Sequence, residues 1–269
     1  MSKTVTAAVV QMCSGPDVQA NLKQAEELFA DMESSVDLIV LPECFAQFGG
    51  DVPVLGNNTS VVRNWMSRLA RQSRAWLVGG SIPCVVNEGE NSRASCFVYD
   101  PEGNEVTRYD KIHLFDADVS DGTRRYRESD DYSPGSDLKV VDMEFARTGL
   151  SICYDVRFPE LYRELRVREA EIITVPSAFT RVTGRAHWEP LLRARAIENQ
   201  CYVLAPDQSG THPNERETWG HSLIISPWGE VLAEAGKAPC ILTAELDMKA
   251  LREIRKQMPC FEHRVLWKK

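Results

Sequence analysis

Two sites in the chain combine the end of an apolar segment with a side chain that can perform proton transfer or nucleophilic attack. Glu43 follows shortly after the apolar run Val36–Leu41. A carboxylate in this position would lie at the carboxyl edge of a sheet, where open α/β sheets bind their ligands. Cys153 ends the apolar run Gly149–Cys153, and Pro159 favours the start of a helix shortly afterwards. A thiol at such a sharp strand-to-helix junction is an accessible nucleophile, and free backbone N–H groups there lower its pKa.

A third candidate, Lys111, follows the segment Glu105–Tyr109 and precedes His113 by two positions. From this segment alone, Lys111 could equally be a surface residue, as most lysines are. His113, among apolar neighbours, has the alternative of a structural histidine. Likewise, Glu43 could be a solvated carboxylate, and Cys153 could be a buried, inert thiol. The individual segments leave these alternatives open.

The composition narrows the class of protein. The chain has 269 residues, 43% of them hydrophobic, and 31 basic against 39 acidic side chains give a formal net charge of −8. Nucleic acids and anionic membranes are bound through basic surface, so neither partner is expected. The sequence has no run of about 18 apolar residues that could span a bilayer. Its N-terminal segment lacks the apolar core of a signal peptide, so we expect a cytoplasmic protein.

Eight cysteines are spread along the chain: Cys13, Cys44, Cys84, Cys96, Cys153, Cys201, Cys240 and Cys260. No two of them lie within five residues of each other, which excludes a C-x-x-C zinc site. Most lie in apolar runs, where a free cysteine packs as a small core residue. In a reducing compartment this pattern predicts free thiols, without structural disulfides or metal ligands.

The N-terminal third alternates between two kinds of pattern. Thr4–Gln11, Val36–Leu41 and Trp76–Ile82 are apolar segments typical of buried strands. Between them, apolar residues recur every three or four positions from Val18 to Met32 and over Val61–Arg74, as on one face of a helix. This βαβαβ order is typical of a layered α/β fold.

Two hairpins are predicted further along the chain. Ser95–Tyr99 and Glu105–Tyr109 flank a turn that contains Pro and Gly, and Leu223–Ile225 and Val231–Ala233 flank a similar one. Each half of the chain therefore combines buried strands, helices and one hairpin. This arrangement predicts two mixed sheets packed against each other with helices outside.

The region between the hairpins again alternates strands and helices. Strands are predicted over Gly149–Cys153, Glu171–Val175 and Gln200–Ala205, and helices over Phe158–Arg168 and His187–Asn199.

A last strand over Cys240–Leu246 precedes a last helix over Met248–Gln257. No linker or low-complexity tract interrupts the chain, so residues 1–269 are expected to form one domain.

Together, the three candidate segments resemble the nitrilase, or carbon–nitrogen hydrolase, superfamily. The glutamate, lysine and cysteine of that superfamily match, in the same chain order, Glu43 in L-P-E, Lys111 in Y-D-K-I-H-L and Cys153 in S-I-C-Y-D-V-R-F-P-E. Other matching segments, such as P-S-A-F, A-H-W-E and W-G-H-S, extend the resemblance over nearly the whole chain. A second glutamate of the family matches Glu128 in Y-R-E-S. The resemblance implies the α/β class and a four-layer α-β-β-α sandwich of two mixed sheets.

The resemblance also implies hydrolysis of an amide through a cysteine thioester. It implies Cys153 as the nucleophile, Glu43 as the general base, Lys111 as the group that stabilises the oxyanion and Glu128 as the residue that positions the lysine. The backbone N–H of Tyr154 would complete the oxyanion hole. No metal and no organic cofactor is implied.

Within the superfamily, the chain is most similar to the branch that contains deaminated glutathione amidase and ω-amidase, which act on amides of small α-keto acids. The segment Q-S-G-T-H followed by W-G-H-S is more similar to the first of these. Arg185 replaces a proline that is usual in the branch, which leaves the exact substrate open. The alternatives are α-ketoglutaramate, a nitrile or an N-carbamoyl compound. A non-catalytic binding protein with the same fold would be expected to lack one of the three residues.

An anionic keto-acid substrate needs cationic and N–H donors. The residues expected to contact it are Tyr154, Arg157, Phe179, Arg181 and His187. Further candidates are Arg185 and the cluster 124–127, for which a solvated loop is the alternative. The only other partner expected is a second copy of the chain, because the resemblance suggests a homodimer or a larger homo-oligomer that associates through the helices flanking the nucleophile.

Overall fold

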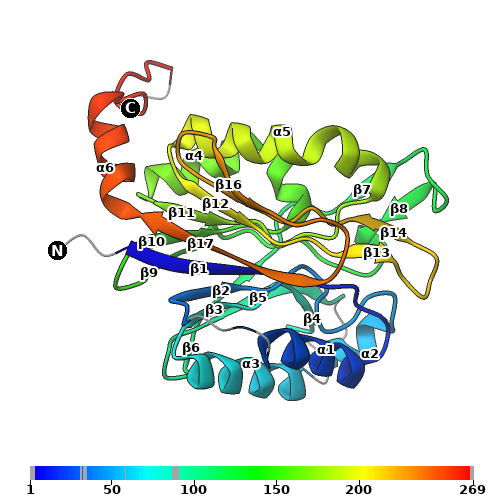
Figure 1. The fold of residues 1–269 in the computed structure, drawn as a ribbon. Helices are drawn as coiled ribbons and strands as arrows, with labels where there is room; N and C mark the ends of the chain where they lie inside the picture. Colours follow the sequence, from blue (N-terminus) through cyan, green and yellow to red (C-terminus); the bar gives the residue numbers. More distant parts are fainter. Residues whose placement is uncertain (1–3, 31, 33–34, 58, 87–90, 267–269) are drawn as a thin grey trace.

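Two β-sheets lie face to face in the middle of the molecule, and helices cover both outer sides (Figure 1). The computed structural model describes residues 4–30, 32, 35–57, 59–86 and 91–266. The four layers confirm the predicted α-β-β-α sandwich. The first three residues, which belong to the segment tested for a signal peptide, lie outside the described residues.

The first sheet has seven strands in the order β17–β1–β2–β3–β5–β4, and β6 pairs with the opposite side of β5. Strands β1, β2 and β3 run parallel, while β17, β4, β5 and β6 pair antiparallel, so the sheet is mixed. The bounds of its strands are β1 Thr4–Gln11, β2 Leu38–Val40, β3 Trp76–Val78, β4 Ile82–Cys84, β5 Arg93–Tyr99, β6 Glu105–Asp110 and β17 Cys240–Asp247.

Strand β1 shows why this sheet is apolar on both faces. Val5, Ala7 and Val9 pack in the core between the two sheets, whereas Ala8 and Val10 pack in the core beneath the outer helices. Successive side chains of a strand point to opposite faces, so a strand covered on both sides needs a continuous apolar run.

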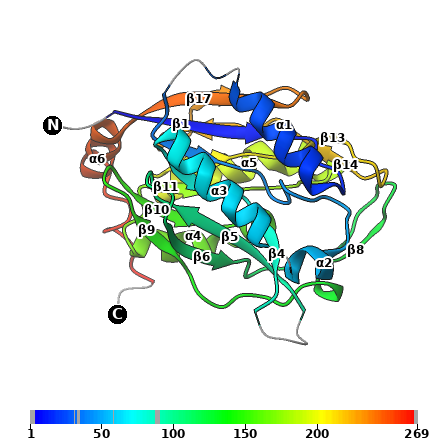
Figure 2. The ribbon, with the colours of Figure 1, turned by 90° about the horizontal axis from the view of Figure 1, so that it is seen from below.

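Helices α1 (Val18–Ala30) and α3 (Ser60–Ser73) cover the outer face of this sheet, and the short helix α2 (Val52–Asn57) lies near one end (Figure 2). The carboxylate of Asp17 accepts the Ala20 N–H at 2.9 Å and so caps the first turn of α1. Both long helices match the predicted amphipathic segments.

The predicted strand Trp76–Ile82 is instead two strands, β3 and β4, which was not expected from its apolar run. Leu77 pairs with Tyr99 and Ile82 with Ser95, so this side of the ladder contains one residue more than β5. The interruption contains Gly80 at φ +56°, where a Cβ atom would collide with the Pro42 carbonyl oxygen. The close approach of the chain just before Glu43 therefore breaks the strand.

The second sheet has six strands in the order β16–β15–β12–β11–β10–β9. Their bounds are β9 Val140–Asp142, β10 Arg147–Leu150, β11 Ile172–Thr174, β12 Tyr202–Ala205, β15 Leu223–Ile225 and β16 Val231–Glu234. Helices α4 (Pro159–Val167) and α5 (Arg181–Asn199) cover its outer face (Figure 1). Both predicted hairpins, β5–β6 and β15–β16, are present.

Two predicted boundaries in this half were wrong. The strand before the nucleophile ends at Leu150, and Cys153 opens a 3-10 helix, η2 (Cys153–Arg157). Helix α5 begins at Arg181 rather than His187, because the Thr180 hydroxyl caps it by accepting the Thr183 N–H at 3.3 Å.

Two small hairpins lie at one end of the sandwich. One consists of β7 (Asp116–Asp118) and β8 (Arg125–Arg127), followed by the 3-10 helix η1 (Glu128–Asp130), and the other of β13 (Ser209–Thr211) and β14 (Glu217–Trp219). Helix α6 (Met248–Gln257) lies at the opposite end (Figure 1). Within the described ranges, no helix has the length and apolar character needed to cross a membrane.

Candidate active site

Three charged side chains that are far apart in the sequence meet below the surface. The Lys111 Nζ atom lies 2.8 Å from Oε1 of Glu43 and 2.9 and 2.8 Å from the two carboxylate oxygens of Glu128. Lys111 is 2% exposed and Glu43 is 5% exposed. The ammonium is buried and donates hydrogen bonds to both carboxylates. Lys111 is therefore not a surface residue, which was the alternative left open by its sequence segment.

The ends of three strands supply these residues. Glu43 follows β2, Lys111 is the residue after β6, and Glu128 opens η1 directly after β8. The Lys111 N–H donates to the Ala94 carbonyl at 2.9 Å, which continues the β5–β6 pairing up to the site. Glu128 also accepts the Phe115 N–H at 2.6 Å, so its carboxylate orientation is set by the backbone as well as by the lysine.

Cys153 lies at the first position of η2 with φ +46°, in the left-handed region that non-glycine residues rarely adopt. Its own N–H donates to the Pro176 carbonyl at 2.8 Å. The side chain of Asp155 accepts the Ile152 N–H at 2.8 Å and closes the turn. Such backbone strain is maintained only where surrounding contacts impose it, and here it directs the largely buried side chain of Cys153 toward the cavity at a strand-to-helix junction.

The thiol of Cys153 lies against the Glu43 carboxylate. Burial, then the negative charge of Glu43, raise the pKa of the Cys153 thiol well above its usual value, while Lys111 opposes the shift. The free backbone N–H groups at the junction therefore do not produce the lowered pKa that the sequence suggested. The resting group is thus a neutral thiol beside the Glu43 carboxylate, and the Ala178 N–H opposes part of the rise in its pKa.

The charge state of Lys111 follows from its partners. Burial by itself would lower the lysine pKa, but Glu128 and Glu43 together raise it well above its usual value. Burial raises the pKa of Glu128, while Lys111 opposes that shift. The site therefore holds a permanent ammonium beside a neutral thiol and a carboxylate that can accept its proton. This arrangement can carry out nucleophilic attack with proton transfer.

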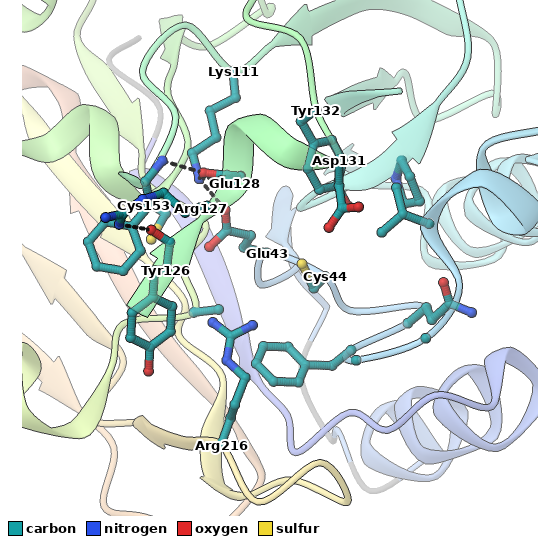
Figure 3. A pocket seen from close by; sticks show the side chains of 18 of the residues that line it. Glu43, Cys44, Lys111, Tyr126, Arg127, Glu128, Asp131, Tyr132, Cys153 and Arg216 are labelled. Atoms are coloured by element: carbon teal, nitrogen blue, oxygen red, sulfur yellow. Dashed lines mark hydrogen bonds and ion pairs between the residues drawn. The ribbon is translucent and has the colours of Figure 1, made fainter. Parts of the chain in front are cut away.

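A cavity of about 280 Å³ opens over these groups (Figure 3). Its size is close to the lower end of the ~300–1,000 Å³ range of small-molecule sites. Its walls come from the loop after Glu43, from the β7–β8 hairpin with η1, and from the tip of the β13–β14 hairpin. The polar side chains that line it are Glu43, Cys44, Gln47, Lys111, Thr123, Tyr126, Glu128, Asp131, Tyr132 and Cys153, with the arginines Arg125, Arg127 and Arg216.

A smaller space of about 20 Å³ adjoins the main cavity, and Phe115, Cys153 and Ala178 line both. Tyr154, Arg157 and Phe179, three of the residues expected to contact substrate, line the smaller space. The Arg157 guanidinium lies 5.7 Å from the centroid of the Tyr154 ring and 5.3 Å from that of Phe179. It also lies 3.2 Å from Nδ1 of His187.

The other two expected contacts lie outside both spaces. Arg181 forms an ion pair with Glu217 at 2.7 Å and its side chain is 58% exposed. His187 is exposed on α5 and reaches the smaller space only through Arg157. Arg185 is exposed on the same helix. Their contribution to substrate binding stays a prediction.

Residues 124–127 differ in their positions: Arg125, Tyr126 and Arg127 line the main cavity, and Arg124 does not. Arg125 and Arg127 line the main cavity, and Arg127 donates to the Tyr126 carbonyl at 2.6 Å and to Asp118 at 3.0 Å. Tyr126 is buried and donates its hydroxyl to Asp121 at 2.8 Å. Arg124 and Arg125 are exposed, as the solvated-loop alternative allows, whereas Tyr126 and Arg127 are ordered by their contacts.

Sequence reasoning missed several residues of the cavity. Arg216 lies at the tip of the β13–β14 hairpin, and Phe48 and Tyr132 come from loops that carry no motif. Cys44 was interpreted as one of the inert cysteines, yet it lines the cavity next to Glu43, and burial raises the pKa of its thiol to about 12. The only local signal was the charged segment between Q-S-G-T-H and W-G-H-S, which contains Arg216.

His113 is a structural residue in this fold. Its ring Nδ1 lies 2.7 Å from Oδ1 of the buried Asp155, and the ring stacks on Phe158 with centroids 3.6 Å apart. All eight cysteines are free thiols. Over the described ranges, no group of three or more His, Cys, Asp or Glu side chains is arranged to hold a metal ion.

Comparisons with known proteins agree with this geometry. A family model described as carbon-nitrogen hydrolase matches residues 6–256. The deaminated glutathione amidase of Yersinia enterocolitica is 40% identical over 266 residues, which are 97% of this chain and 93% of that protein. The omega-amidase NIT2-A of Xenopus laevis is 36% identical over 262 residues, 94% of this chain and 92% of that protein.

A solved structure shows the same fold. The crystal structure of the Caenorhabditis elegans NitFhit protein superimposes with a TM-score of 0.88 and 36% identity. The match covers 98% of this chain and 65% of that longer fusion protein.

Proposed function

The chain belongs to the carbon–nitrogen hydrolase family and hydrolyses carbon–nitrogen bonds, and from this premise we propose that it is a thiol-dependent amidase of small α-keto-acid amides. The favoured substrate is deaminated glutathione. The observation that carries the proposal is the buried contact of Lys111 with Glu43 and Glu128, beside the Cys153 thiol.

The first half of the reaction forms a thioester. Glu43 takes the proton of the Cys153 thiol as the sulfur attacks the amide carbon. The Lys111 ammonium and the Tyr154 N–H stabilise the oxyanion of the tetrahedral intermediate. Glu43 then gives the proton to the departing nitrogen, and the amine leaves.

The second half hydrolyses the thioester. Glu43 takes a proton from water as the water oxygen attacks the acyl carbon, and the oxyanion again lies against Lys111. The sulfur leaves, recovers a proton from Glu43, and the carboxylic acid departs. Glu128 takes no part in proton transfer but keeps the ammonium in place. Because the resting thiol has a raised pKa, a base in direct contact is required for attack.

The favoured substrate rests on the names and identities of the relatives. Proteins named deaminated glutathione amidase are 37–42% identical to this chain, and those named omega-amidase are 35–36% identical. Hydrolysis of deaminated glutathione releases α-ketoglutarate and the dipeptide Cys-Gly, whereas α-ketoglutaramate releases α-ketoglutarate and ammonia. The second substrate is the main alternative, followed by a nitrile or an N-carbamoyl compound.

The test is a parallel assay of α-ketoglutarate formed from both substrates. Faster turnover of deaminated glutathione, absent from Cys153→Ala, is the expected result. Equal or better turnover of α-ketoglutaramate would indicate an ω-amidase. Turnover of neither would contradict the keto-acid substrate class. Undiminished activity of Cys153→Ala would contradict the nucleophile.

We further propose that residues 1–269 form a single domain, that the protein acts in the cytoplasm, and that it associates as a homodimer or a larger homo-oligomer. Helices α4 and α5 lie on the outside of the second sheet, which leaves an external face for such contact (Figure 1). Light scattering of the purified protein measures the association.

A further inference from the structure

Arg216 is held between two aromatic rings at the outer part of the main cavity. Its guanidinium carbon lies 4.9 Å from the ring centroid of Phe48 and 4.9 Å from that of Tyr126. Figure 3 shows this guanidinium pointing into the cavity, toward Glu43 and Cys44. The three residues come from the β13–β14 hairpin, the loop after Glu43 and strand β8, so three walls of the cavity meet at this arginine.

The hairpin that carries Arg216 is fixed. The His212 N–H donates to the Arg216 carbonyl at 2.9 Å. The buried ring of His212 lies 2.7 Å from the Ser14 carbonyl and stacks on Phe48 with centroids 3.9 Å apart. The arginine is therefore presented by a rigid turn, and little conformational entropy is lost when it binds a partner.

No acidic side chain among the described residues uses the guanidinium donors of Arg216. Within the described part of the chain, no carboxylate oxygen lies within 4.0 Å of this guanidinium. Among the other cations that line the cavity, Arg127 pairs with Asp118 and Lys111 pairs with Glu43 and Glu128. Arg125, like Arg216, has no acidic partner among the described residues. A planar guanidinium with free donors in a cavity matches the two oxygens of a carboxylate.

The position of Glu43 indicates which end of the substrate reaches Arg216. Because Glu43 must give its proton to the departing nitrogen, the leaving group has to lie on the Glu43 side of Cys153. Cys44, Phe48 and Arg216 line the main cavity together with Glu43, whereas the smaller space with Tyr154 and Phe179 contains none of them.

We propose that Arg216 binds the carboxylate of the leaving group and so selects amides whose departing amine is a short peptide. This inference rests on the proposed amidase function and deepens it. Of the two candidate substrates, only deaminated glutathione has a carboxylate on its leaving group, at the glycine residue. Ammonia, the leaving group of α-ketoglutaramate, has none.

The test compares three substrates in the full-length protein and in Arg216→Gln. The substrates are deaminated glutathione, the same compound with its glycine carboxylate converted to an amide, and α-ketoglutaramate. Loss of a hydrogen bond to a charged group lowers kcat/KM for deaminated glutathione by about 10- to 100-fold, mainly through KM. The other two substrates should change by less than about threefold, since neither leaving group bears a charge.

Arg252→Gln is the matched control, because Arg252 lies on α6 at the far end of the molecule and pairs with Glu171. It should leave all three substrates unchanged. An equal loss on all three substrates in Arg216→Gln, or no loss on any, would overturn the role of Arg216. Wild-type protein that hydrolyses none of the three would contradict the proposed function itself, and the inference with it.

Discussion

The hydroxyl of Tyr109 donates a 2.6 Å hydrogen bond to Oδ2 of Asp155. Asp155 also accepts the backbone N–H of His113 at 3.1 Å and lies 2.7 Å from its ring. Tyr109 and His113 stand two residues before and after Lys111, and Asp155 stands two residues after Cys153. One buried carboxylate therefore joins the segment of the lysine to the turn of the thiol.

Replacement Tyr109→Phe removes part of this link and keeps the ring. We expect kcat to fall by about 5- to 50-fold with a smaller change in KM, because Lys111 and Cys153 lose their mutual alignment. The free energy of unfolding should fall by about 1–2 kcal/mol for the lost buried hydrogen bond. Steady-state kinetics and urea denaturation measure the two effects.

Tyr162→Phe is the control for this change. Tyr162 is equally buried, and its hydroxyl pairs with Ser151 at 2.8 Å without reaching the lysine segment. It should lose similar stability while kcat stays within about threefold. Equal losses of kcat in both variants would show that general packing, not the link through Asp155, is responsible.

Glu128→Gln tests the positioning of Lys111. The amide leaves the ammonium with one carboxylate in place of two, so its position over the substrate oxygen is less well defined. We expect kcat to fall by about 10- to 100-fold, and Glu43→Gln, which removes the base, to cost at least about 10³-fold. A Glu128→Gln enzyme with wild-type kcat would contradict the positioning role.

Gly80→Ala should disturb both stability and the site. Gly80 has φ +56°, and the added methyl group would meet the Pro42 carbonyl, just before Glu43. We expect a loss of about 2–4 kcal/mol in the free energy of unfolding and a marked loss of kcat. Gly122→Ala, where nothing lies within 4 Å, should stay within about 0.5 kcal/mol of wild type. Equal stability of the two variants would disprove the close approach.

Stability should decrease at alkaline pH. Burial raises the pKa of Cys96 and of Cys44 to about 12, and burial also raises that of Cys153. The same thiols ionise near pH 9 when the chain unfolds. The folded state therefore keeps protons that the unfolded state has lost, and the free energy of unfolding falls as pH rises above about 9.

Urea midpoints measured under reducing conditions at pH 7, 9 and 10.5 test this dependence. The decrease should begin near pH 9, and Cys96→Ala, which removes one of the buried thiols, should make it shallower. Lys111 acts in the same direction, since its raised pKa means that its contribution is complete below about pH 10.5 and is lost above its folded pKa. A midpoint that rises between pH 9 and 10.5 would contradict the assignment.

Much of the secondary structure follows from local patterns. Thr4–Gln11 and Met248–Gln257 are a strand and a helix with the predicted bounds, because each contains a single clear periodicity. The motifs around Glu43, Lys111 and Cys153 identified the family and with it the sandwich. Taken alone, none of the three residues could be told from a solvated or inert side chain.

Only the tertiary structure decided how these residues are arranged. The left-handed turn at Cys153, the strand break at Gly80 and the buried partners of Lys111 each depend on segments far away in the chain. Arg216 contacts Phe48 and Tyr126 for the same reason, since three separate loops meet there. The periodicity of a segment shows which of its faces is buried. The walls of a cavity form where loops far apart in the chain pack together, and a local sequence pattern does not show which loops will meet.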